Sequence, residues 1–167
     1  MFKEIKPQEI PDNPFEAIGT GWMLITAGNL KKYNMMTASW GGWGVLWHKN
    51  ICFCVVRPGR YTYAFLEKAD YFTLSYFDSQ HKGKLEFCGA KSGRDVDKMK
   101  LAGLTPVEGL NGSVYFQEAR LVIVCKKIYY QQINPENFLE ASIENNYPNK
   151  DYHRMYVGEV LNCLLEK

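Results

Sequence analysis

The sequence predicts a mainly β fold, an antiparallel barrel with a few short helices, on three observations. Short segments rich in β-branched and aromatic residues follow one another closely, separated by Gly, Asn, Lys and Pro. The helical patterns between them are few and short, which disfavours a parallel sheet with alternating helices. The 167 residues fit a single domain, 1–167. A domain of this length can bury about 70% of its unfolded surface without metals or disulfides.

The strands can be placed along the chain in order. Residues 1–20 hold three of the seven prolines and no regular period, so we expect an extended arm. Residues 114–133 have continuous strand character, with apolar side chains alternating between two faces from Leu121 to Cys125. The other strands are expected at WMLITA (22–27), NMMTASW (34–40), ICFCVVR (51–57), YFTLSYF (71–77) and MYVGEVLNCLLE (155–166).

Three short helices are expected between the strands. The first is YTYAFLEKA (61–69), which follows the helix breaker Pro58-Gly59 and carries apolar residues at helical spacing. The second covers residues 81–89. The third covers residues 95–102, where Val96 and Met99 face the core before Gly103.

Charge and composition exclude several classes of protein. The net charge is +2 with no block of like charges, so we expect neither a nucleic-acid partner nor an anionic membrane. No apolar run approaches the ~20 residues of a membrane span, and the first residues lack the apolar core of a signal peptide, which predicts a cytoplasmic protein. The aromatic content of 14% is high and indicates a binding protein.

The five cysteines are predicted to be reduced core residues. Their number is odd and none forms a CxxC pair. Cys52 and Cys54 would share one face of a strand near His48, but the four-ligand spacing of a zinc site is missing. We therefore favour burial as small hydrophobic residues and expect no metal.

The segment NMMTASWGGWGVLW (34–47) is the first candidate binding element. Three tryptophans and three glycines lie beside the small residues Thr37, Ala38 and Ser39. Tryptophan offers a large apolar area, and glycine permits close backbone approach. This combination predicts a wall built against a large, flat ligand.

The segment RPGRYTY (57–63) is a candidate anion site. A helix N-terminus presents unpaired N–H groups and partial positive charge, and Arg57, Arg60 and Thr62 would add donors, so a phosphate is a natural ligand. A capped helix with two solvated arginines explains the segment equally well.

Two further segments contain polar groups that could serve a ligand. In CGAKSGRDVDK (88–98), small residues permit close approach and Arg94 and Lys98 supply cations, although a loop before a helix capped by Asp95 is the favoured reading. In YPNKDYHRMYVGEV (147–160), His153 is the best general-acid candidate of the three histidines, although a lone loop histidine is usually just solvated.

No Ser-His-Asp order, GxGxxG, P-loop or HExxH is present, which removes the commonest hydrolase, dinucleotide-fold and zinc-protease readings.

Taken in order, these segments, with YFTLSYF and EARLVIVC, resemble the flavin reductase-like, FMN-binding split-barrel family, specifically its flavoredoxin-like branch. The resemblance covers roughly residues 19–160 and implies a homodimer of Greek-key split β-barrels that bind FMN noncovalently near the dimer interface. It also implies site residues by matching positions. The flavin ring and ribityl chain would lie against Thr37, Ala38, Ser39 and Trp40, and the phosphate against Arg57, Arg60, Tyr61 and Thr62. The loop that covers the cofactor would contain Cys88, Gly89, Ser92, Gly93 and Lys98. The segment at the reducing face of the flavin would contain Asp151, Tyr152, His153 and Arg154.

The resemblance implies a flavoprotein oxidoreductase that passes electrons from NAD(P)H through bound FMN to a second acceptor. His153 is the candidate catalytic residue, as a donor of a proton or a hydrogen bond, and Arg154 or Lys98 would attract an anionic donor. Two alternatives remain open: a noncatalytic FMN-binding electron carrier or flavin store, and a barrel that binds haem or another planar ligand.

Overall fold

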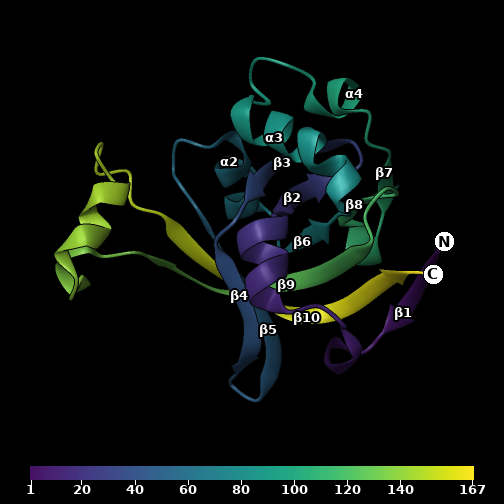
Figure 1. Cartoon of the computed structure of the whole chain (residues 1–167), viewed down its shortest axis with the longest axis horizontal. Helices are drawn as coiled ribbons and strands as arrows, with labels where there is room; N and C mark the ends of the chain where they lie inside the picture. Colours follow the sequence, from purple (N-terminus) through teal and green to yellow (C-terminus); the bar gives the residue numbers. More distant parts are fainter.

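The computed structural model describes residues 1–167 and consists mainly of antiparallel strands (Figure 1). This confirms the predicted fold class. The strands are β1 (Phe2–Ile5), β2 (Met23–Asn29), β3 (Lys32–Ala38), β4 (Gly41–Leu46), β5 (Lys49–Val56), β6 (Tyr71–Tyr76), β7 (Pro106–Glu108), β8 (Val114–Phe116), β9 (Leu121–Gln132) and β10 (Arg154–Glu166). The α-helices are α1 (Pro14–Glu16), α2 (Tyr61–Lys68), α3 (Lys82–Ala90) and α4 (Lys98–Ala102).

The main sheet closes into a barrel with one open seam. Its strand order is β3-β2-β6-β9-β10-β5-β4, so β3 and β4 lie at the two ends of the sheet. The chain nevertheless joins them directly, because β3 ends at Ala38 and β4 begins at Gly41. The sheet must therefore curl until its ends meet, and the split of the barrel lies at Ser39 and Trp40. A hydrogen bond of 2.8 Å from Trp43 Nε1 to Tyr76 Oη links β4 to the opposite wall.

Strand β9 explains how both faces of the wall are covered. Leu121, Ile123 and Cys125 belong to the core cluster inside the barrel, as the predicted alternation requires. Val122 and Val124 belong to a second cluster on the outer face, which α3, α4 and β8 cover (Figure 1). Because both faces are dry from Leu121 to Cys125, this part of β9 is a continuous apolar run.

All five cysteines are free and buried, which confirms their reading as core residues. Cys88 packs in the outer cluster. The other four lie in the barrel interior: Cys52, Cys54, Cys125 and Cys163. None of the helices is both long and apolar enough to cross a membrane.

Three local expectations are corrected by the structure. Residues 1–20 are not an extended arm: only Phe2–Ile5 is extended, where it pairs with the end of β10, and short helical turns follow. The third helix begins at Lys98 rather than residue 95, because the Asp97 carboxylate accepts a hydrogen bond from Lys100 N and caps it. Strand character over 114–133 is interrupted at residues 117–120, between β8 and β9.

Strand β4 was not expected, since three of its six residues are glycine. It forms because Phe53 on β5 covers the paired Gly42: a Cβ at Gly42 would lie 2.5 Å from the Phe53 ring. The aromatic ring thus replaces the packing that a side chain on β4 would provide.

The connection between β9 and β10 forms an arm that projects from the barrel (Figure 1, yellow-green). Its short helical turns are Pro135–Asn137 and Ala141–Asn146. The Arg57 guanidinium, just after β5, holds the arm through Asp151 Oδ1 at 2.7 Å and the Asn146 carbonyl at 2.7 Å. The arm therefore brings residues 147–153 beside the end of β5.

Candidate functional site

The seam of the barrel presents the segment Thr37–Trp40. Thr37 lies near the end of β3, and its hydroxyl donates a 2.5 Å hydrogen bond to the Leu85 carbonyl of α3. Gly89 allows this close packing, because a Cβ there would lie 3.3 Å from Thr37 Cβ. Trp40, in the short link between β3 and β4, is 44% exposed. One small, polar wall and one aromatic ring thus flank the opening.

A small cationic cavity lies next to this wall, at the start of α2. Its volume is about 180 Å³, and none of its lining residues is acidic. The N-terminus of α2 adds unpaired N–H groups at the same place. The lining residues are Asn34, Met36, Gly59, Arg60, Tyr61, Thr62, Ala90, Lys91, Ser92, Gly93, Arg94 and Lys98.

Three of the four cations of this cavity are held by backbone carbonyl groups rather than by carboxylates. Lys98 Nζ donates to the Met35 carbonyl at 2.5 Å and to the Cys88 carbonyl at 3.0 Å. Arg60 donates to the Gly89 carbonyl and Arg94 to the Gly59 carbonyl, each at 3.0 Å. Carbonyl dipoles orient these groups and leave their charge uncompensated.

Burial makes this uncompensated charge costly. Lys98 is only 4% exposed. Desolvation lowers the pKa of its amine to about 8, with a further lowering from Arg60 that the Cys88 thiol partly opposes. Burial and the neighbouring Arg57 also lower the pKa of Arg60. A bound anion would relieve both penalties.

A buried amide fixes the floor of the cavity. Asn34 on β3 is buried and donates a 2.7 Å hydrogen bond from Nδ2 to Thr62 Oγ1 in the first turn of α2. Gly93 leaves room for this amide, because a Cβ at that position would lie 2.1 Å from Asn34 Oδ1. The glycine predicted for close approach therefore serves the protein's own side chain.

His153 lies between the arm and the seam. It is 8% exposed, its Nδ1 lies 2.9 Å from Tyr147 Oη, and its ring centroid lies 5.1 Å from that of Trp40. Burial lowers its pKa to about 4, and Arg57 adds to this effect while Asp151 partly opposes it. The imidazole is therefore neutral at pH 7, able to offer a hydrogen bond but holding no extra proton.

The structure separates the remaining predicted residues from the cavity. Arg57 pairs with Asp151 and lies over the Tyr147 ring, 5.1 Å from its centroid. Through its hydrogen bond, Arg57 lowers the pKa of the Asp151 carboxyl. Tyr152 Oη donates to Glu144 within the arm, and Arg154 pairs with Glu67 on α2 at 2.7 Å. These contacts hold the arm and α2 in place.

Comparison with known proteins identifies the family. A family model described as "Flavin reductase like domain" matches residues 15–167. The chain belongs to the flavin reductase-like family. A search of curated proteins found no match.

Solved structures share the split-barrel fold at low identity. An FMN-binding protein from Thermus thermophilus, with bound p-hydroxybenzaldehyde, has a TM-score of 0.71 at 18% identity, covering 99% of this chain and 82% of that one. The flavoredoxin of Desulfovibrio vulgaris (Miyazaki F) has a TM-score of 0.69 at 22% identity, covering 98% and 78%. A flavoredoxin from Methanosarcina acetivorans has a TM-score of 0.70 at 20% identity, covering 99% and 76%. At these identities the three structures establish the shared fold.

In this flavin reductase-like chain the structure also adds residues that the sequence motifs missed. Asn34 and Lys91 line the cavity, and Tyr147 contacts His153. A polar residue inside the apolar strand NMM was a usable signal for Asn34. Cys88 contributes its carbonyl alone, because its thiol points into the core.

Proposed function

We propose that residues 1–167 form a single FMN-binding domain that passes electrons from NAD(P)H through bound FMN to a second acceptor. One observation carries this proposal: a cavity with four cationic and no acidic side chains lies beside the seam of a flavin reductase-like barrel. An anionic tail fits the cavity, and a flat ring fits the adjoining wall.

The fit of FMN rests on the chemistry of the donors. Arg60, Lys98 and the Thr62 hydroxyl would hold the phosphate, since their charge and hydrogen-bonding capacity are not used by any carboxylate. The backbone at Gly89, Ser92 and Gly93 would cover the tail. Thr37, Ala38, Ser39 and Trp40 would line the ribityl chain and the ring.

Bound FMN would supply the hydride and electron chemistry, while the protein supplies position and hydrogen bonds. His153 would act as a neutral hydrogen-bond partner at the ring edge, oriented by Tyr147 and packed on Trp40. Of the two roles expected for His153, we keep the hydrogen bond and drop the donation of a proton by an imidazolium, because a group with a pKa of about 4 is not protonated at pH 7. Of the two residues expected to attract an anionic electron donor, Lys98 is buried and would be occupied by the FMN phosphate, and Arg154 is neutralised by Glu67.

We also propose that two copies associate through the β4–β5 hairpin and the adjoining face of β9. Val45 is 73% exposed and Trp47 is 55% exposed, and Trp47 packs edge-on against the exposed Tyr129. Trp47 and His48 adopt φ of 51° and 59°, a region that disfavours such side chains. An aromatic held in this conformation at an exposed tip fits an isologous contact. A cytoplasmic location agrees with the free thiols.

Cofactor release and titration test the first part of the proposal. The purified protein is denatured, any released yellow chromophore is identified, and the stripped protein is titrated with FMN. Bound or retaken FMN is the expected result. No chromophore together with no FMN uptake overturns the proposal, and a haem spectrum supports the planar-ligand alternative.

Turnover separates the enzyme from a carrier. The FMN-loaded protein is mixed with NADH or NADPH and with ferricyanide as acceptor, and nicotinamide oxidation is followed. An enzyme oxidises one of the two donors, whereas a pure electron carrier or flavin store oxidises neither. Unchanged reduction and reoxidation rates in His153→Ala would remove His153 from the mechanism.

A further inference from the structure

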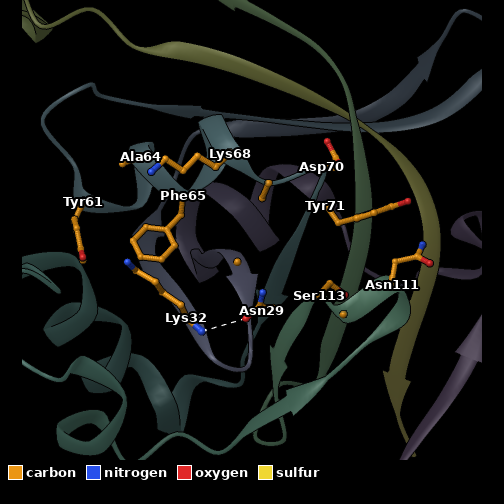
Figure 2. Close-up of a pocket in the computed structure, with 13 residues that line it drawn as sticks. Asn29, Lys32, Tyr61, Ala64, Phe65, Lys68, Asp70, Tyr71, Asn111 and Ser113 are labelled. Atoms are coloured by element: carbon orange, nitrogen blue, oxygen red, sulfur yellow. Dashed lines mark hydrogen bonds between the residues drawn. The ribbon is translucent and has the colours of Figure 1, made fainter.

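Two larger cavities adjoin the phosphate cavity on the side away from the seam. The first, of about 690 Å³, lies between the β2–β3 hairpin, α2 and residues 111–113 (Figure 2). The second, of about 600 Å³, lies between β3, α2 and residues 93–99. Each has the size of a typical ligand pocket. Neither is needed to hold an FMN whose phosphate ends at Arg60 and Lys98.

Shared residues border neighbouring cavities, and we call the two larger cavities together the trench. Tyr61 lines all three, and Phe65 lines the two larger ones. Arg94 lines the phosphate cavity and the second cavity, with its guanidinium 5.0 Å from the Tyr61 ring centroid. A ligand part that extends beyond the phosphate would therefore reach the trench beside α2.

The lining of the trench suits an aromatic group that carries phosphate. Tyr61 and Phe65 pack edge-to-face with centroids 5.1 Å apart, and their remaining surfaces face the trench. Lys32 lines both larger cavities, and Figure 2 shows its side chain beside the ring of Phe65, reaching toward Tyr61. Across the first cavity, Asp70 and Asn111 offer polar groups to base or sugar edges.

The charge of the trench is mixed but positive. The second cavity has four cationic residues, Lys31, Lys32, Arg94 and Lys98, against the two acids Asp95 and Asp97. The first has Lys32 and Lys68 against Asp70. A phosphate near Lys32 and a base near Phe65 match this distribution.

We propose that the trench is a subsite for an adenosine phosphate group, with Phe65 and Tyr61 as the stacking surface and Lys32 as the phosphate contact. The inference rests on the proposed flavin site, since the trench begins where the FMN phosphate would end. The group could arrive in two ways: as the second half of a flavin dinucleotide, or as the distal half of a nicotinamide dinucleotide.

The experiment compares FMN, FAD and NADH as ligands. Affinities of the wild type, Lys32→Glu and Phe65→Leu are measured by titration, with FMN and FAD added to stripped protein and NADH added to FMN-loaded protein without oxygen. Phe65→Leu keeps an apolar but smaller side chain and removes the ring, and Lys32→Glu alters an exposed side chain. Lys3→Glu, on exposed β1, is the matched control for the charge change.

We expect both variants to lower affinity for one dinucleotide at least fivefold, while FMN affinity changes less than twofold and the control changes nothing. A loss confined to FAD assigns the subsite to a flavin dinucleotide, and a loss confined to NADH assigns it to the nicotinamide donor. Normal FMN binding with both dinucleotides unaffected overturns this inference alone. Failure of the wild type to bind FMN overturns the proposed function, and this inference with it.

Discussion

Two buried threonines offer a matched test of how the candidate site is held together. Thr62, in α2, is completely buried and accepts the 2.7 Å hydrogen bond from Asn34 Nδ2. Thr26, in β2, is 1% exposed, and its hydroxyl has no hydrogen-bond partner. Thr→Val replaces each hydroxyl by a methyl group of nearly the same shape. The same substitution therefore removes a hydrogen bond at Thr62 and an unpaired buried hydroxyl at Thr26.

The structure gives opposite signs for the two changes. In Thr62→Val the amide of Asn34 keeps only its 3.3 Å contact to the Met35 carbonyl, and a buried donor left short of a partner costs about 1–3 kcal/mol. We expect the free energy of unfolding to fall by about 1–2 kcal/mol. In Thr26→Val the burial cost of an unpaired hydroxyl disappears, so stability stays equal or rises by up to about 1 kcal/mol.

Urea unfolding of the stripped proteins measures both changes. For a chain of this length, 1 kcal/mol corresponds to a shift of about 2–4 °C in Tm, so thermal unfolding gives a second reading. FMN titration gives the third: Thr62→Val weakens binding by about tenfold through the lost donor, and Thr26→Val leaves binding unchanged. Equal destabilisation by the two variants, or full FMN affinity in Thr62→Val, would refute the reasoning.

Three further predictions concern titratable and strained residues. His153, with a folded pKa of about 4, should make the protein less stable as pH falls from about 6.5 to 4, because only the unfolded imidazole takes up a proton. The difference in unfolding free energy between wild type and His153→Gln should change by up to about 3 kcal/mol over this window, and a constant difference would contradict it. The lowered pKa of Lys98, about 8, acts in the same direction at higher pH: stability of the stripped protein should rise from about pH 8 to 10.5, where only the unfolded amine stays protonated. Lys98→Met should flatten this rise in urea titrations. Replacing Trp47-His48 by Asn-Gly should relieve the strain of the positive-φ turn and stabilise the isolated chain by about 1 kcal/mol. In sedimentation velocity, the dissociation constant of the dimer should rise at least tenfold. An unchanged dimer would remove the hairpin from the interface.

The strands that can be predicted from the sequence are those whose own side chains pack on the faces of the barrel wall. The alternation in β9 marks two buried faces, and α2 is marked by the breaker Pro58-Gly59 before it. Strand β4 escapes prediction because its packing surface belongs to Phe53, on a different strand. The early start expected for α4 fails for a related reason: Asp95 and Asp97 are both plausible caps, and Asp97 is the one that caps it. Propensity locates a helix better than it locates its end.

Prediction of the candidate site is limited in the same way, by contacts between residues that lie far apart in the sequence. RPGRYT correctly predicted a cationic helix start, because the chemistry is contained in six neighbouring residues. The two arginines of that segment nevertheless have different surroundings: Arg60 lines the cavity, whereas Arg57 pairs with Asp151, 94 residues later. No local pattern distinguishes them, since the partner is supplied by the arm after β9.

The difference between Arg57 and Arg60 also explains where a ligand charge is needed. Arg57 has a carboxylate at 2.7 Å, so its charge is balanced by the protein. Arg60 and Lys98 have only carbonyl partners, and burial lowers the pKa of both. A fold that balanced these groups with a carboxylate of its own would be more stable empty and would repel a phosphate. The missing acid is therefore the feature on which the proposed anion site at the start of α2 rests, next to the seam where β3 and β4 are not paired with each other.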